Sequence, residues 1–265
     1  MKIYISADLE GITGISHWDE ATLSKQEYEI FQEQMTREVT AACEGAIAAG
    51  ATEIIVKDAH DTGRNLDPYQ LPYPAQLIRG WSGHPYNMVQ ELNSSFSALI
   101  LIGYHSRSGS GKNPLAHTLS EELNCILLNG QPIAEFHLVA MTAAYERVPV
   151  VFVSGDSGVC QAVKVYDTNI KTLTTNKGIG ESVWAIHPEE TIRQIQAGVE
   201  SALQYLHQIQ VKPLPENFKL EVEYKHPPDA YENSFYPGAK LQGEQSVLFE
   251  TDDWFEVIRT LCFIV

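Results

Sequence analysis

The chain has 265 residues, of which 44% are hydrophobic and 20% are charged. This composition is that of an ordinary globular protein, and it excludes collagen-like, coiled-coil and wholly disordered chains. Because the formal net charge of −16 repels phosphate backbones and anionic lipid headgroups, we expect neither nucleic acid nor a membrane as a partner.

Four short β-branched runs in the first two thirds of the chain are predicted strands. They cover residues 3–5, 53–57, 98–102 and 149–153. Nearly continuous apolar runs of this length are typical of strands that are covered on both faces, as in parallel sheets. The predicted fold class is therefore α/β, with a mostly parallel central sheet flanked by helices.

Helical patterns lie between and after these predicted strands. The first helical pattern lies between the strands at 3–5 and 53–57: Ser24 and Glu27 have the spacing of a capping box, an apolar stripe follows, and Gly50 is placed to end the helix. This helix and its two neighbouring strands form a βαβ unit. Further stripes predict helices over residues 133–145 and 191–209.

The sequence pattern changes after Val211, where a proline-containing segment interrupts the alternation of predicted strands and helices. Residues 212–215 read Lys-Pro-Leu-Pro, which predicts a stiff connector, and strands are predicted at 219–224 and near 247–249. We therefore predict an α/β catalytic domain over residues 1–211 and a small α+β C-terminal region over residues 212–265. The apolar last five residues are expected to dock on the fold.

The cysteines and the start of the chain bear on cellular location. The four cysteines stand far apart and form no C-x-x-C pair, so we expect buried, reduced thiols. Met1 and Lys2 run directly into an apolar strand, without the basic and apolar regions of a secretory leader. We expect a cytoplasmic protein.

Three of the predicted strands end in side chains that can bind a metal ion. Asp8 and Glu10 follow the first strand, Asp58 and His60 the second, and His105 the third. The carboxyl ends of parallel strands lie along one edge, where α/β folds bind ligands, so these side chains are expected to converge. Each alone could instead cap a helix or bind loop amides, but their joint occurrence favours a metal site. A set of ligands made of histidine and carboxylate side chains, without a cysteine thiolate, favours zinc, manganese or cobalt. It is also more typical of a catalytic than of a structural metal site.

Six short motifs occur in order along the chain: D-L-E-G-I-T-G at 8–14, K-D-A-H at 57–60, G-Y-H at 103–105, A-H-T at 116–118, N-G-Q-P-I-A-E at 129–135 and S-G-D at 154–156. Together they resemble the motifs of peptidase family M55, the D-aminopeptidases encoded with dipeptide transport operons, and the resemblance covers residues 2–215 in collinear order. Two positions depart from the family pattern: Ala134 stands where the family has Gly, and Ser157 where it has a second acidic residue.

The resemblance implies a zinc-dependent aminopeptidase that hydrolyses short peptides with an N-terminal D-amino acid, such as D-Ala peptides. It implies two Zn2+ ions per subunit and a homodecamer that encloses its active sites. The implied metal ligands are Asp8, which would bridge the two ions, and Glu10, His60, His105 and Glu135. His117 matches the family's catalytic histidine, as a nucleophile or as a general acid and base.

Two other functions stay open. A dinuclear site also serves other amidohydrolases and phosphoesterases, although Arg107 and Lys112 are the only basic residues near the motifs. A non-catalytic peptide-binding protein associated with a transporter is the third hypothesis, which the complete ligand set and His117 disfavour. A serine hydrolase is disfavoured because Ser154 lacks the flanking glycines of G-x-S-x-G.

Residues outside the motifs receive simpler interpretations. Asp156 is expected to cap a loop or helix, and residues 106–113, rich in Ser and Gly, to form a mobile loop. Residues 66–81 are expected to form a lid, an oligomer contact or an inserted subdomain. Five histidines without motif partners are expected at the surface or at caps: His17, His84, His187, His207 and His226.

Overall fold

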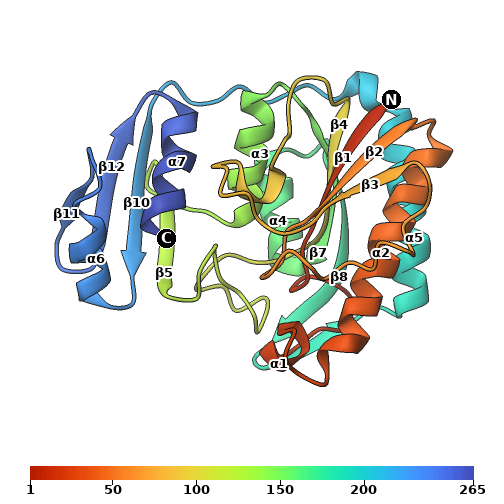
Figure 1. The fold of residues 1–265 in the computed structure, drawn as a ribbon, viewed down its shortest axis with the longest axis horizontal. Helices are drawn as coiled ribbons and strands as arrows, with labels where there is room; N and C mark the ends of the chain where they lie inside the picture. The colour runs from red at the N-terminus through yellow and green to blue at the C-terminus, as the bar shows by residue number, and fades with distance from the viewer.

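The predicted strands are part of a seven-stranded sheet, seen near the centre of the computed structural model, which describes residues 1–265 (Figure 1). Its strand order is β3-β2-β1-β4-β7-β8-β9. The strands are β1 Lys2–Ala7, β2 Glu53–Asp58, β3 Ala75–Ile78, β4 Ala98–Tyr104, β7 Val150–Asp156, β8 Lys171–Ile179 and β9 Ser182–Ala185. All neighbouring pairs are parallel except β8 and β9. The predicted α/β class with a mostly parallel sheet is confirmed.

Two helix layers cover this sheet. Helices α2 Tyr28–Ala48 and α5 Pro188–Gln204 lie on one side, and α3 Glu135–Tyr145 and α4 Ser157–Tyr166 on the other (Figure 1). Successive side chains of a strand point to opposite faces. Accordingly Ile3 and Ile5 of β1 belong to the core under α2 and α5, and Tyr4 belongs to the core under α3 and α4.

The start of α2 differs from the predicted capping box. Ser24 lies in a turn before the helix, and the N-cap residue is Glu27, whose side chain makes no capping hydrogen bond. Its backbone is already in the right-handed helical region, whereas a capping side chain needs an extended backbone at that position. The apolar stripe is buried as predicted, and Gly50, with φ of +93°, follows the last turn.

Two other predicted helices have shifted bounds. Helix α3 begins at Glu135 rather than residue 133, since the backbone of Ala134 is extended. Helix α5 begins at Pro188 behind the cap His187 and ends at Gln204, and the short 3-10 helix η2 Leu206–Gln208 follows. The prediction missed α4, the short helix α1 Trp18–Ala21, the 3-10 helix η1 Asn87–Val89 and several strands.

A second, antiparallel sheet has the strand order β11-β12-β10-β5-β6. Its strands are β5 Leu123–Leu128, β6 Gln131–Pro132, β10 Phe218–Tyr224, β11 Lys240–Gln242 and β12 Ser246–Thr251, and it is accompanied by α6 Pro227–Asn233 and α7 Trp254–Ile264. The two predicted C-terminal strands are therefore present as β10 and β12; they pair with each other, and β10 also pairs with β5 from the middle of the chain. The division into residues 1–211 and 212–265 stays a prediction.

Helix α7 lies between the second sheet and α3, which covers the first sheet (Figure 1). Leu261 and Ile264 are buried in the core of the second sheet, whereas Cys262, Phe263 and Val265 are exposed, so the expected docking holds for only two of the last five residues. Trp254 is buried too, and its Nε1 donates a hydrogen bond to Thr142 Oγ1 of α3 at 3.1 Å. The end of the chain is thus fixed against a helix of the first sheet.

All four cysteines are free, and Cys43 and Cys160 are buried. Cys125 is half-buried and Cys262 is exposed, so the expectation of buried thiols is wrong for these two. Cys262 lies on a face of α7 that borders cavities instead of the core. None of the helices combines the length and the apolar character that a membrane crossing requires.

Candidate metal centre

The ends of β1, β2 and β4 lie side by side at one edge of the central sheet. Ala7 pairs with Asp58 on one side and with Ile102 on the other. Beyond this register, the Asp8 amide donates to the Ile102 carbonyl and the Ala59 amide donates to the Ala7 carbonyl, both at 2.8 Å. The segments that carry Asp8, His60 and His105 therefore leave the sheet together.

Two glycines allow these segments to approach each other closely. The Gly11 amide donates to the Gly103 carbonyl at 2.8 Å, and a Cβ atom on Gly11 would lie 1.8 Å from the Tyr104 carbonyl oxygen. Gly103 has φ of +73°, and a Cβ atom there would lie 2.2 Å from the Asp8 carbonyl oxygen. Only glycine fits at both positions. The close approach of these two segments positions Glu10, the residue before Gly11, beside the end of β4.

The first group of potential ligands consists of Asp8, Glu10 and His60, all buried. His60 Nδ1 lies 3.5 Å from Asp8 Oδ1 and 3.0 Å from Glu10 Oε2. His60 Nε2 donates to the Ala21 carbonyl at 2.7 Å, so the proton is on Nε2 and Nδ1 faces the carboxylates. A carbonyl that fixes the ring in this way is typical of a metal-binding histidine.

The second group consists of Asp8, His105 and Glu135, also buried. His105 Nε2 lies 3.5 Å from Asp8 Oδ2 and 3.2 Å from Glu135 Oε2. His105 Nδ1 donates to the Ser106 carbonyl at 2.9 Å, and Glu135 Oε1 accepts from the Leu119 amide at 2.7 Å. Glu135 is the first residue of α3, so a helix start positions this carboxylate.

The donor atoms of these groups fit divalent cations. Within each group the potential ligand atoms lie within 4.8 Å of one another. Asp8 Oδ2, Glu10 Oε2 and His105 Nε2 are buried without a hydrogen-bond partner, which is rare for polar atoms in a folded protein. Carboxylate oxygen and imidazole nitrogen are the donor types of catalytic zinc sites. The two oxygens of Asp8 face different histidines, as a bridging ligand requires.

The electrostatics of the cluster also favour a cation. Burial, followed by the charge of Glu10, raises the pKa of Asp8 well above its usual value. Burial opposes the charged forms of His60 and His105, but the surrounding carboxylates outweigh it and raise both pKa values. Three carboxylates are thus buried close together, and their mutual repulsion is unfavourable in the absence of solvent. Bound cations would balance this negative charge.

His117 lies at the opening of the cluster, with 14% of its side chain exposed. Its Nδ1 donates to the Leu115 carbonyl at 2.9 Å. Its Nε2 lies 3.8 Å from Glu10 Oε1 and 3.7 Å from Glu135 Oε1, longer than the contacts of the other two histidines. The ring stacks on His105 at a centroid distance of 4.3 Å. Glu10, His105 and His117 also form a third group with ligand spacing.

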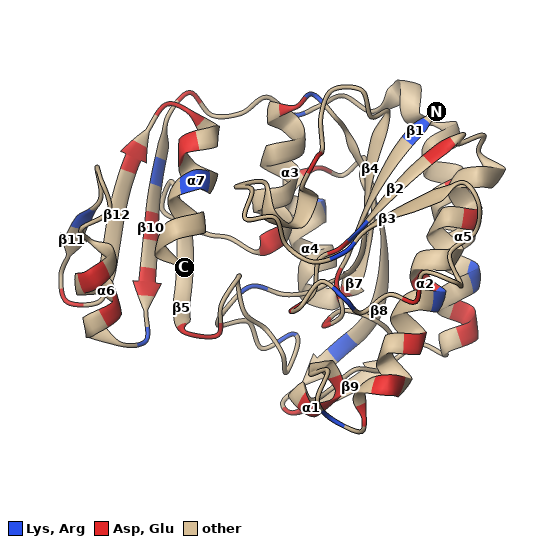
Figure 2. Cartoon of the chain, in the orientation of Figure 1, with Lys and Arg blue, Asp and Glu red and all other residues tan.

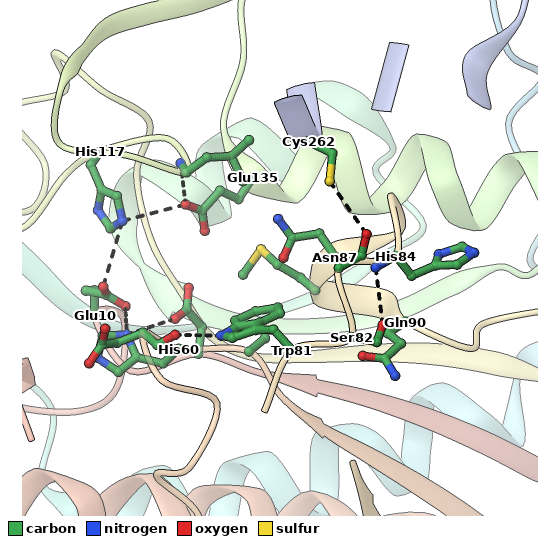
Figure 3. Close-up of a pocket in the computed structure, with 16 residues that line it drawn as sticks. Glu10, His60, Trp81, Ser82, His84, Asn87, Gln90, His117, Glu135 and Cys262 are labelled. Carbon is green, nitrogen blue, oxygen red and sulfur yellow. Dashed lines mark hydrogen bonds and ion pairs between the residues drawn. The ribbon is translucent and has the colours of Figure 1, made fainter. Parts of the chain in front are cut away.

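All six residues predicted from the motifs are therefore close together, and five of them line one cavity of about 420 Å3. His105 is not a lining residue, but its ring stacks on that of His117, which is. Figure 3 shows Glu10, His117 and Glu135 facing the cavity from three different segments of the chain. Sequence analysis missed other residues of the lining, because they belong to no motif: Trp81, Asn87, Gln90 and Cys262. His84, expected only at the surface, is exposed and also lines the cavity.

Lys57, the first residue of the K-D-A-H motif, was given no functional role from the sequence. It is fully buried, and its Nζ donates to the Asp58 and Gly80 carbonyls at 2.6 and 2.7 Å. The ammonium group also lies 3.9 Å from the centroid of the Trp81 ring, and burial lowers the pKa of Lys57 to about 8. Lys57 thus positions Trp81 in the cavity wall. A lysine inside an apolar strand is the signal that could have identified it.

The loop before His117 is anchored at several points. Asp156 caps α4 as expected, and its carboxylate also accepts hydrogen bonds from the amide and hydroxyl of Ser106 at 2.6 Å. Asn113 Nδ2 donates to the Glu10 carbonyl and to Asp156 at 2.8 and 3.0 Å. These contacts hold both ends of the segment that was expected to be a mobile loop.

Three comparisons with known proteins agree with one another. The sequence model of peptidase family M55, described as D-aminopeptidase, matches residues 1–263. A D-aminopeptidase of Bacillus subtilis (strain 168) is 29% identical over 265 residues, covering 98% of this chain and 95% of that protein. A solved structure described as the Zn-dependent D-aminopeptidase DppA from Bacillus subtilis, a self-compartmentalizing protease, aligns with a TM-score of 0.94 and 27% identity. That alignment covers 100% of this chain and 96% of DppA.

Proposed function

The chain belongs to peptidase family M55, the D-aminopeptidases, and from this premise we propose that it is a zinc enzyme with a dinuclear site. Its proposed substrates are short peptides with an N-terminal D-amino acid, such as D-Ala peptides. The observation that carries the proposal is the position of Asp8, whose two oxygens face the histidines of two separate ligand groups. The similarity to the Zn-dependent DppA supports zinc as the metal.

We assign one ion to the group of Asp8, Glu10 and His60 and the other to the group of Asp8, His105 and Glu135. Zinc in such a site acts as a Lewis acid that polarises a carbonyl group and makes water nucleophilic near neutral pH. The hydrogen bonds from His60 to the Ala21 carbonyl and from His105 to the Ser106 carbonyl fix both rings. Neither ring then has to reorient when a ligand binds.

His117 is the proposed proton carrier. The Leu115 carbonyl holds its Nδ1, so its Nε2 faces the cavity in which the peptide would lie. In this position Nε2 can give a proton to the amine that leaves when the peptide bond breaks. A nucleophilic role for the same atom is the alternative.

Phosphate esters fit the cavity less well. None of its lining residues is Lys or Arg, whereas Arg107 and Lys112 line a different cavity. With two zinc ions bound, the carboxylates of the lining are largely neutralised, and a phosphoester substrate would find no Lys or Arg side chain for the charge that the ions leave unbalanced. A peptide bond carries no such charge, so this lining favours a peptide.

The proposal is tested by metal content and by stereoselective turnover. We expect about two zinc ions per chain by inductively coupled plasma spectrometry. We also expect release of D-Ala from D-Ala-D-Ala, loss of this activity on chelation and its return with added zinc. L-Ala-L-Ala is the matched control and is expected to remain intact. A protein without bound metal, or with equal turnover of both dipeptides, contradicts the proposal.

A further inference from the structure

A second cavity of about 390 Å3 lies beside the metal cavity. Of its 13 lining residues nine are hydrophobic, and none has a charged side chain. Leu138 and Val139 of α3 form one wall, and Ile258 and Leu261 of α7 form another. All four are buried in the fold, so their apolar surface is already shielded except toward this space.

The two cavities share part of their lining. Asn87, Met88, Leu119 and Cys262 border both. Figure 3 shows Cys262 and Asn87 on the side of the metal cavity opposite His60. A molecule bound at the metal cavity can therefore extend past these four residues into the apolar space.

These four shared residues form the junction of the two cavities, which comes near His117 only at Leu119, because Figure 3 shows Cys262 and Asn87 across the metal cavity from His117. Leu119 follows His117 by two residues, and its amide donates to Glu135 Oε1 at 2.7 Å. If His117 protonates the leaving amine, as proposed above, then the leaving part of the peptide lies next to Leu119. The residue after the cleaved bond is thus the part of the substrate nearest to the apolar cavity.

We infer that the second cavity binds the side chain of the residue that follows the N-terminal D-amino acid, and that this side chain is large and apolar. This inference rests on the proposed function and names its substrate class. An apolar side chain gains free energy when it leaves water for such a cavity. An acidic side chain would lose its hydration there without meeting a Lys or Arg side chain.

The first test compares kcat/KM for four dipeptides. D-Ala-D-Leu is expected to exceed D-Ala-D-Ala by about tenfold or more, and D-Ala-D-Glu to fall below both. D-Leu-D-Ala is the matched control, with the same side chain on the other residue, and no such gain is expected. Equal values for D-Ala-D-Leu and D-Ala-D-Ala, or a gain for D-Leu-D-Ala alone, overturn the inference and leave the proposed function intact. No turnover of any dipeptide overturns the proposed function, and the inference with it.

The second test fills the junction between the two cavities with a larger side chain. Because Cys262 borders both cavities, Cys262→Trp is expected to obstruct the way into the apolar cavity and to lower the ratio of kcat/KM for D-Ala-D-Leu to that for D-Ala-D-Ala by about tenfold. Phe263→Trp is the matched control on the same helical turn, because Phe263 is 68% exposed and stacks on Tyr236 outside the cavity. Val265→Trp, at an exposed position of the lining, is a second filling variant with the same expectation. An unchanged ratio in both filling variants, with an unchanged melting temperature, overturns the inference.

Discussion

Asp8 is the residue on which the two proposed ion sites depend. It is the only residue that the two groups have in common. We therefore expect Asp8→Ala to lose both ions, while Glu135→Ala removes a ligand from one group only. Metal content by inductively coupled plasma spectrometry distinguishes the variants. An Asp8→Ala protein that retains two ions contradicts the shared-ligand assignment.

His117 is expected to act on the substrate rather than on the metal. Its Nε2 is farther from the carboxylates than the ring nitrogens of His60 and His105 are. His117→Ala should therefore keep its metal while kcat falls by about 100- to 10,000-fold. His207→Ala, at an exposed position on η2, is the matched control and should keep full activity. Loss of metal in His117→Ala would instead show that His117 is a metal ligand, as a member of the group of Glu10, His105 and His117.

His137 gives a pH dependence of stability. Its Nδ1 accepts from the Ala134 amide at 3.0 Å at the start of α3, and burial lowers its pKa to about 4. Between the unfolded value of 6.5 and about 4, the unfolded chain binds a proton that the folded chain does not. This contribution to stability is therefore complete above pH 6.5 and is lost as the pH falls toward 4.

The variant His137→Gln isolates this effect. Glutamine at this position can also accept from the N-cap amide, but it does not titrate. We expect the melting temperature of the variant to fall less than that of the wild type as the pH is lowered from neutral to about 4. Parallel pH curves for the two proteins would contradict the assignment to His137.

At the level of elements, the contact between the ends of β1 and β4 is the most constrained part of the site. A methyl group on Gly11 would meet the Tyr104 carbonyl oxygen at 1.8 Å, and the backbone must move to accept it. Gly11→Ala should lower the free energy of unfolding by about 2 kcal/mol or more and reduce activity, because Glu10 is displaced. Gly111→Ala is the control, since no atom lies within 4 Å of its Cβ position. Urea titrations of both variants check this expectation.

At the scale of the whole molecule, the exposed aromatic side chains are the candidates for contacts between chains. Tyr69, Tyr73 and Trp184 are exposed by 96%, 95% and 73%. Tyr69 and Tyr73 lie close together in sequence before β3, and Trp184 lies in β9 at the opposite edge of the central sheet, so they form two separate places and no single patch. DppA is described as self-compartmentalizing, and the homodecamer stays our prediction for this chain.

Light scattering tests the assembly. We expect one species with ten times the mass of a single chain. Acidic positions lie on α2, α5, α6 and β10 (Figure 2), so identical chains repel one another at low salt. The assembly should therefore be more stable at moderate than at very low salt concentration. A monomer under all salt conditions contradicts the prediction.

The central sheet was predictable because its strands are covered on both faces and therefore read as continuous apolar runs. The residues of β4 and β7 are buried throughout, and both strands were predicted. Strand β8 has several half-exposed positions, and β5 alternates only in part, so neither gave such a signal. The capping box at Ser24 was wrong because sequence spacing does not report the backbone angles of Glu27.

The sequence alone determined the fold class, because the burial pattern of a strand is a local property of the chain, and it indicated Asp8, Glu10, His60 and His105 as possible metal ligands because they follow predicted strands. Glu135 and His117 were indicated only by the resemblance to the family. Only the tertiary structure decided which atoms face each other, such as the two oxygens of Asp8 and the rings of His60 and His105. It alone placed Trp81 and Cys262 at the cavity, since loops and a C-terminal helix far apart in sequence meet there. The physical reason is that a cavity is formed by packing between elements, and packing depends on the whole chain.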